Sequence, residues 1–183
     1  MTTRIEEKFK YLNKKNKKAL VCFLTAGDPN KKISAKVLSL LPESGADLIE
    51  IGIPFSDPMA DGPTIQRSSL RAIKSGINLK QILEMVRDFR KNDSKTPIIL
   101  MGYFNPIFQY GLKNFFIDSS KSGVDGIIAV DLPPEENSLI YDYSKKFNID
   151  IIRLLTPTTD IERLKKILKS TSGFLYYVSI MGI

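Results

Sequence analysis

The sequence predicts an α/β fold in which strand and helix units repeat around a parallel sheet. Short apolar runs alternate with amphipathic stretches along the chain, which is typical of repeated βα units. Each run is nearly continuous in Val, Ile, Leu and aromatic residues, as expected where both faces of a parallel strand are covered. Neither GxGxxG nor GxxxxGKS/T, the phosphate motifs of open nucleotide-binding sheets, is present. Together these observations favour a (β/α)8 barrel, the TIM barrel.

The length limits how much of that barrel the chain can form. A (β/α)8 barrel typically takes ~250 residues, whereas this chain has 183 residues and shows six apolar runs. We therefore expect a single domain, residues 1–183, that is a TIM barrel truncated after about six strands. The expected strands are 19–26, 46–54, 96–103, 124–132, 149–156 and 173–180.

Helices are indicated between these strands by apolar residues at helical spacing. A short opening helix is expected because Ile5, Phe9 and Leu12 fall at i, i+4 and i+7. Glycines follow several of the helical segments, and Asp or Pro residues precede them, as at helix ends. We expect the apolar stripes to pack on the sheet, including the stripe of Ile161, Leu164, Ile167 and Leu168. The other expected helices are 31–43, about 64–74, 78–91, 111–122, 134–147 and 159–171.

The composition excludes several classes of protein. The 43% of hydrophobic and 26% of charged residues are ordinary for a globular domain and argue against disorder. No apolar run reaches the ~18 residues of a membrane span, and the N-terminus lacks the features of a secretory signal. We therefore expect a cytoplasmic protein, or one of the plastid stroma if its gene is organellar, without membrane contact.

The absence of histidine restricts the chemistry further. It removes every His-based proton shuttle and the usual zinc sites, so that no metal is expected, and the single Cys22 cannot form an intrachain disulfide. Acid–base chemistry must then rely on Asp, Glu, Lys, Tyr or this Cys. A lysine imine is also disfavoured, because none of the expected strands contains a lysine.

The net charge of +7 leaves a nucleic-acid-associating protein as an alternative function. The cluster Lys14, Lys15, Lys17 and Lys18 is its strongest support. Most other lysines are spaced along expected helices, where they would lie on solvated faces, so we expect no nucleic-acid partner.

Glu50 is the first candidate for chemistry, because it interrupts the apolar strand LIEIGIP. In a parallel barrel its side chain must face the interior or the helix layer, and both are mostly dry. Burial raises a carboxyl pKa towards values useful for proton exchange near neutral pH. A buried Glu that is held by hydrogen bonds for structural reasons is an equally good interpretation of its position alone.

The loop after that strand, IPFSDPMADGPTIQ, adds Asp57 and Asp61 close to Glu50 in sequence. Working residues of such barrels lie at the carboxyl ends of strands, where this loop begins. Two carboxylates in different surroundings can divide acid–base and electrostatic roles. For either Asp alone, a role in capping a turn or helix remains the better interpretation.

Several segments taken in order resemble one enzyme family. LTAGDPN, DLIEIGIPFSDPMADGPTIQ, MGYFNPIFQYG, GVDGIIAVDLPPEE and LLTPTT followed by GFLYYVS are similar to the strand and loop signatures of tryptophan synthase alpha chains. The resemblance extends from about residue 16 to the last residue. It implies a lyase of tryptophan biosynthesis that cleaves indole-3-glycerol phosphate into indole and glyceraldehyde 3-phosphate by a retro-aldol step.

The resemblance also implies roles for individual residues. Glu50 would be the general acid–base that serves indole C3 and the glycerol hydroxyl, and Asp61 would accept the indole N–H and stabilise positive charge on the ring. The ring would lie in an apolar slot. By the same resemblance, the residues that line this slot are Phe23, Ile65, Met101, Tyr103, Val130 and Tyr176.

A partner chain is implied as well. Relatives associate with a beta chain that carries pyridoxal phosphate in an α2β2 heterotetramer, so no cofactor is expected on this chain. The residues expected to face that partner are Pro54, Asp57, Pro58 and Asn105. In relatives the phosphate-binding amides follow the position of residue 183. We therefore expect the 183-residue chain by itself to be inactive or nearly so, and an inactive truncated barrel is an alternative to the lyase function.

Overall fold

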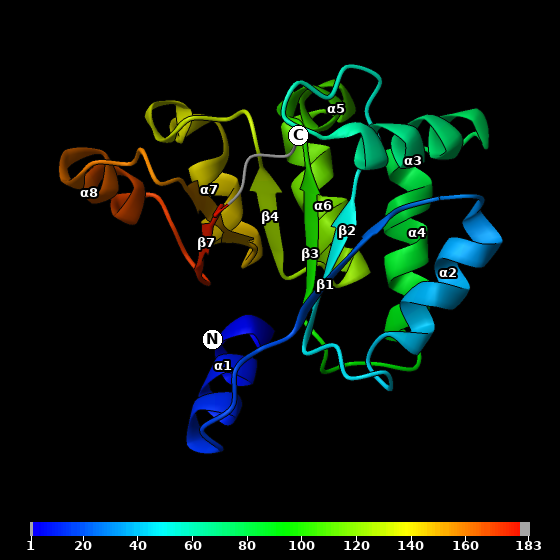
Figure 1. The fold of residues 1–183 in the computed structure, drawn as a ribbon, viewed down its shortest axis with the longest axis horizontal. Coiled ribbons are helices and arrows are strands. Elements are labelled where there is room, and N and C mark those ends of the chain that lie inside the picture. The colour runs from blue at the N-terminus through cyan, green and yellow to red at the C-terminus, as the bar shows by residue number, and fades with distance from the viewer. Residues whose placement is uncertain (1, 180–183) are drawn as a thin grey trace.

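A parallel sheet surrounded by helices forms the centre of the computed structural model, which describes residues 2–179 (Figure 1). Five strands pair in the order β1-β2-β3-β4-β5, and all of these pairs are parallel. β6 and β7 form a second parallel pair. The strands are β1 Val21–Thr25, β2 Leu48–Gly52, β3 Ile98–Gly102, β4 Gly126–Ala129, β5 Asp150–Ile151, β6 Arg153–Leu155 and β7 Leu175–Tyr177.

The predicted strands are confirmed, but the observed strands are shorter than the predicted ones and one predicted strand is interrupted. The expected strand 149–156 divides at Ile152 into β5 and β6. The Ile152 N–H still donates to the Ile127 carbonyl at 3.0 Å, so the chain stays extended while it passes from one sheet to the other. Of the expected strand 173–180, residue 180 lies outside the described residues.

Helices connect the strands as expected, with one addition and one division. The expected helix 134–147 forms as the short η1 followed by α7. The short helix α5 was not predicted, because the motif MGYFNPIFQYG places Pro106 inside it; this proline lies in the first turn, where the missing N–H costs nothing. The helices are α1 Arg4–Lys14, α2 Lys31–Leu40, α3 Pro63–Lys74, α4 Leu79–Arg90, α5 Phe104–Tyr110, α6 Leu112–Ser122, η1 Pro134–Glu136, α7 Ser138–Phe147 and α8 Ile161–Lys169.

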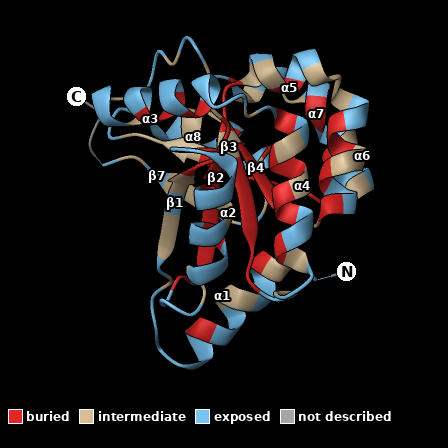
Figure 2. Ribbon diagram, turned by 90° about the vertical axis from the view of Figure 1, so that its right-hand side faces the viewer, coloured by how far each residue is buried: buried red, intermediate tan, exposed pale blue. Residues whose placement is uncertain are grey.

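The larger part of the core lies between the sheet and the helices. Figure 2 shows β2, β3 and β4 and the inward faces of α4 and α6 in the colour of buried residues, and the outward faces of these helices as exposed. Phe115 and Phe116 of α6 are fully buried there and stand edge to face, with ring centroids 5.4 Å apart. Residues 49 and 51 of β2 point into this layer together with their neighbours on β3 and β4.

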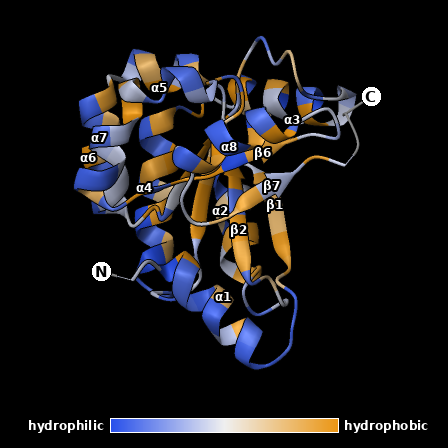
Figure 3. Cartoon of the chain, turned by 90° about the vertical axis from the view of Figure 1, so that its left-hand side faces the viewer, coloured by the Kyte–Doolittle hydropathy of each residue, from blue (hydrophilic) through white to orange (hydrophobic). Residues whose placement is uncertain are grey.

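A second, smaller cluster covers the opposite face of the strands, which is the interior face of the barrel. Leu48, Ile99, Ile128 and Ile152 form it, and Ile5 of α1 closes it at the amino-terminal ends of the strands. Figure 3 shows the hydrophobic strands β1 and β2 above α1. Because side chains alternate along a strand, Glu50 shares this interior face with Leu48.

The prediction that the apolar stripe of α8 packs on the sheet is wrong. Of its four residues only Ile167 is buried, whereas Ile161 and Leu168 are 72% and 52% exposed. α8 stands at the edge of the described structure, with one side against the loop after β4 (Figure 1). Within residues 2–179, no further layer covers the rest of the stripe.

A buried ionic cluster ties the amino-terminal side of the fold together. The Asp125 carboxylate, 4% exposed, accepts from Arg4 at 2.8 Å, from Arg90 at 2.7 Å and from the Ile98 N–H at 2.8 Å. Arg90 also donates to the backbone carbonyls of Gly123 and Thr96. One carboxylate thus joins α1, α4, β3 and the segment before β4.

We expect Asp125→Ala to lower the free energy of unfolding by about 3 to 5 kcal/mol, because Arg90 would be left buried without its counter-ion. Urea denaturation followed by circular dichroism measures the change. Asp88→Ala is the matched control, since Asp88 pairs with Lys91 on an exposed face and should contribute little. Equal effects of the two substitutions would contradict the role assigned to Asp125.

Candidate functional site

Glu50 combines deep burial with a missing hydrogen-bond partner. Its side chain lies in the middle of β2, in register with Phe23 of β1 and Ile99 of β3, and the residue is 3% exposed. The Oε1 atom has no hydrogen-bond partner among the described residues. Burial raises the pKa of this carboxyl to about 7. A carboxyl with this pKa can both donate and accept a proton near neutral pH.

Tyr176 of β7 is the ionisable neighbour of Glu50. Its pKa is raised, first by burial and then by the negative charge of Glu50. The phenol therefore stays protonated beside the carboxyl, and it can donate a hydrogen bond towards that region without competing as a base.

Asp61 lies above the strand ends, at the end of the loop that follows β2. Burial raises the pKa of its carboxyl, and a hydrogen bond from the Tyr103 hydroxyl opposes the rise. The same hydroxyl accepts from the Ala60 N–H at 2.8 Å, so Tyr103 contacts both Ala60 and Asp61. Phe55 packs on the Tyr103 ring, with centroids 5.3 Å apart. Asp61 is thus held over the sheet and remains partly accessible.

A narrow pocket brings together most of the residues expected to form the slot. Its volume is about 30 Å³, room for about two water molecules. Gly52 allows the Phe23 ring to lie across β2 at this place, since a Cβ at residue 52 would stand 2.5 Å from the ring. The residues in its wall that were expected in the slot or as catalytic are Phe23, Asp61, Ile65, Met101, Tyr103 and Val130.

A wider cavity of about 400 Å³ adjoins this pocket and shares Asp61, Met101 and Val130 with it. Tyr176 lines the wider cavity and connects it with Glu50. Its size suits a small metabolite, whereas the narrow pocket is too small for an aromatic bicycle. Leu154 and Thr156 also line it and were not singled out from the sequence. Leu154 lies two residues after Ile152 in a predicted strand, so the alternation of the strand could have found it.

The residues expected at a partner surface lie in the loop after β2 and in α5. Asp57 and Asn105 are exposed, and Pro54 and Pro58 are half-buried. Two large apolar side chains are exposed in the same loop and in α5, Met59 at 84% and Phe108 at 55%. Asp131, at the end of β4, accepts from the Phe104 N–H at 2.7 Å and so holds the start of α5.

The lysine cluster lies elsewhere. Lys14, Lys15, Lys17 and Lys18 are exposed at the end of α1 and just beyond it, at the amino-terminal ends of the strands. Figure 1 shows α1 at the opposite end of the sheet from α5. Among residues 2–179 there is no group of three or more Cys, Asp or Glu placed to hold a metal ion, and no helix long and apolar enough to cross a membrane.

Comparison with known proteins gives one consistent result. The sequence model of the family described as "Tryptophan synthase alpha chain" matches residues 9–183. The tryptophan synthase alpha subunit of Legionella pneumophila str. Paris is 46% identical with a TM-score of 0.95, and the match covers 98% of this chain and 68% of that one.

Two further solved structures are similar. Tryptophan synthase of Mycobacterium tuberculosis is 33% identical with a TM-score of 0.94, over 100% of this chain and 70% of that one. A chain of the tryptophan synthase α2β2 complex of Pyrococcus furiosus is 45% identical with a TM-score of 0.84, over 89% of this chain and 67% of that one. This chain therefore spans about two thirds of the length of the solved chains.

Protonation of Glu50 predicts a pH dependence of stability. The pKa of this carboxyl is about 7 in the folded protein against 4.5 for an unperturbed Glu, so the folded state binds the extra proton between these values. Stability from this group is complete below pH 4.5 and is lost as the pH rises through 7. The loss amounts to about 3 kcal/mol.

Urea unfolding at pH 5 and pH 8 measures this loss. Glu50→Gln removes it, so the wild-type chain should become less stable relative to this variant at the higher pH. Other titrating groups are common to both proteins and cancel in the difference. A difference that stays constant with pH would show that Glu50 titrates at an ordinary value.

Proposed function

The chain belongs to the tryptophan synthase alpha chain family, whose members are lyases, and from this premise we propose that its cavity is the substrate site of a lyase that cleaves indole-3-glycerol phosphate into indole and glyceraldehyde 3-phosphate. The observation that carries the proposal is the buried Glu50, whose Oε1 has no partner among the described residues and whose charge acts on Tyr176 in the wall of a cavity of suitable size. Glu50 itself does not line this cavity, whereas Asp61 does. The indole ring lies in the wider cavity, against Met101, Val130 and Tyr176.

Glu50 is the proposed acid–base. Retro-aldol cleavage needs a proton delivered to indole C3 and a proton removed from the glycerol hydroxyl next to the ring. With a pKa of about 7, the carboxyl is present in both protonation states near neutral pH and can serve both transfers. Its free Oε1 supports the proposal, since a Glu kept for structure would be expected to have its oxygens bonded.

Asp61 is the proposed partner of the ring nitrogen. Protonation at C3 places positive charge on the indole, and a carboxylate at the N–H stabilises this charge in a region with little water. The Tyr103 hydroxyl favours the charged form of Asp61 and keeps it ready for this role, against the effect of burial. The two carboxyls thus divide the work, with Glu50 moving protons and Asp61 stabilising charge.

A partner surface is proposed at the loop after β2 and at α5. The loop with Pro54, Asp57 and Pro58, together with Asn105, would contact a beta chain in an α2β2 assembly of the kind that the Pyrococcus furiosus structure is named for. Exposed Met59 and Phe108 give this surface the apolar centre that stable interfaces have. The pyridoxal phosphate belongs to the partner, no cofactor is proposed for this chain, and the proposed compartment is the cytoplasm or, for an organellar gene, the plastid stroma.

Glu50→Gln should reduce cleavage of indole-3-glycerol phosphate by about 10³-fold or more, because it removes the proton exchange and keeps the shape. Asp61→Asn should also be severe. Release of glyceraldehyde 3-phosphate, measured with the beta chain present, gives the rate. Binding of indole is followed by its own fluorescence, since the chain has no tryptophan, and should be largely kept in both variants.

Glu43→Gln is the control for this pair, because Glu43 is exposed before β2, at the far end of that strand. It should leave both the rate and indole binding unchanged. Turnover of the Glu50→Gln variant near the wild-type rate would refute the catalytic assignment.

Asp57→Lys should weaken association with a beta chain by roughly tenfold, since it reverses a charge in the proposed interface. Isothermal titration calorimetry measures the dissociation constant. Asp142→Lys makes the same charge reversal on the exposed side of α7 and should not change it. If both variants bind the beta chain equally well, the interface lies elsewhere.

A further inference from the structure

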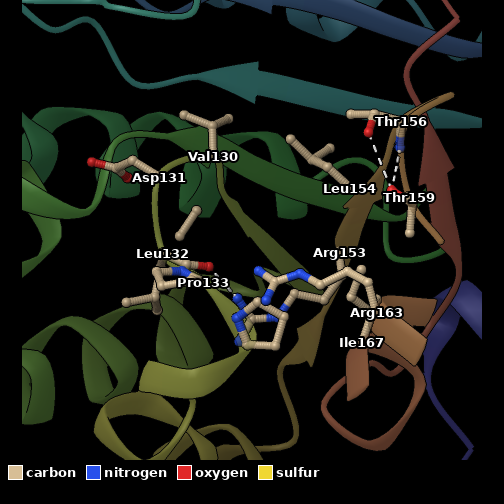
Figure 4. A pocket seen from close by; sticks show the side chains of 12 residues that line it. Val130, Asp131, Leu132, Pro133, Arg153, Leu154, Thr156, Thr159, Arg163 and Ile167 are labelled. Atoms are coloured by element: carbon tan, nitrogen blue, oxygen red, sulfur yellow. Dashed lines mark hydrogen bonds between the residues drawn. The ribbon is translucent and has the colours of Figure 1, made fainter. Parts of the chain in front are cut away.

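A separate cavity of about 290 Å³ lies between the loop after β4, strand β6 and helix α8 (Figure 4). It adjoins the wider cavity at Val130, Leu154 and Thr156. Its polar wall comes from the loop after β4, from β6 and the turn that follows it, and from α8. The polar residues of that wall are Asp131, Arg153, Thr156, Thr159 and Arg163.

Arg153 is a buried cation to which no carboxylate of residues 2–179 is bound. The residue is 5% exposed. Its Nη1 donates to the Leu132 carbonyl at 2.6 Å and its Nη2 to Asn137 Oδ1 at 2.8 Å, and both acceptors are neutral. Its Nε has no hydrogen-bond partner among the described residues. Figure 4 shows the side chain reaching across the cavity towards Leu132 and Pro133.

The surroundings offset this charge only weakly. Burial lowers the pKa of the Arg153 guanidinium, and Glu135 is the one carboxylate of the described chain whose charge acts against the change. Glu135 itself is paired with Arg163 at 2.5 Å. A buried cation without a counter-ion is strongly unfavourable unless a bound anion or polar ligand supplies the compensating charge or hydrogen bonds.

The rest of the wall provides the other contacts that an anion needs. Arg163 is 41% exposed at its side chain, and its pair with Glu135 is a surface ion pair of the kind that is easily exchanged. The hydroxyls of Thr156 and Thr159 lie at the same wall and are hydrogen-bonded to each other at 3.1 Å, which leaves one hydroxyl hydrogen of the pair for another acceptor. Asp131 is the acidic residue of the wall, but it accepts from the Phe104 N–H, and in Figure 4 its side chain points away from Arg153.

We propose that this cavity is a binding site for a small oxyanion, the phosphate or carboxylate group of a metabolite. The anion accepts from the Arg163 guanidinium and from the N–H groups of Arg153 that are not bonded to Leu132 or Asn137, with one threonine hydroxyl as a further donor. Charge-assisted hydrogen bonds from guanidinium groups suit both kinds of oxygen. The volume allows a small metabolite and excludes a peptide or nucleic acid as the main occupant. The site does not depend on the proposed lyase reaction.

Isothermal titration calorimetry of the chain with inorganic phosphate, and separately with acetate, tests the site. The two titrations distinguish a preference for a phosphate group from a preference for a carboxylate group. Both titrations are made in chloride buffer of matched ionic strength. We expect saturable binding of one anion per chain. Arg163→Gln should weaken this binding by roughly tenfold, the loss expected for a hydrogen bond to a charged group. Arg153→Met should abolish it.

Lys165→Gln is the matched control, because it removes the same charge from α8 at an exposed position outside the cavity. It should bind the anion as the wild-type chain does. Arg153 also donates hydrogen bonds to Leu132 and Asn137, so the Arg153→Met variant can fail to fold. In that case the anion affinities of the Arg163→Gln and Lys165→Gln variants decide whether the site exists. Equal loss in these two variants, or no saturable binding of either anion, would overturn the proposal.

Discussion

The parallel register of β1, β2 and β3 is the constraint on which the site depends. Phe23, Glu50 and Ile99 are aligned across these strands, and alternation directs Glu50 to the interior face while Ile49 and Ile51 enter the helix layer. A shift of one residue would exchange the two sets and place a carboxyl among the helices. Both faces of β2 are buried, so the hydrophobic pattern resists such a shift. The position of Glu50 is therefore held by the packing of its neighbours.

How far the fold could be predicted depends on the contacts of each segment. β2 and β3 are covered on both faces, so their apolar runs indicated them directly. The expected helix 134–147 instead divides into η1 and α7, with Asn137 between them. The split of β5 from β6 and the exposure of Ile161 arise from tertiary geometry, namely where a sheet bends and what lies over α8. The spacing of apolar residues does not predict such features.

In the candidate site, too, some features could be predicted from the sequence and others only from the structure. Glu50 could be found because a charge in an apolar strand has few places to go, and the structure gives it a raised pKa and a free oxygen. Arg153 interrupts the run IDIIRLLT in the same manner and was not singled out, although it is as deeply buried. Spacing alone could not show that Asp61 is held by Tyr103, since this contact joins residues distant in the chain.

Val130 lines the narrow pocket, the wider cavity and the cavity beside Arg153. One side chain is thus a shared wall of three spaces, and its volume cannot be changed for one of them alone. A smaller residue would enlarge all three, and a larger one would constrict all three. Substitutions at this position are therefore pleiotropic, and natural selection or a protein engineer who wishes to alter the fit of one ligand must accept or compensate the effect on the others.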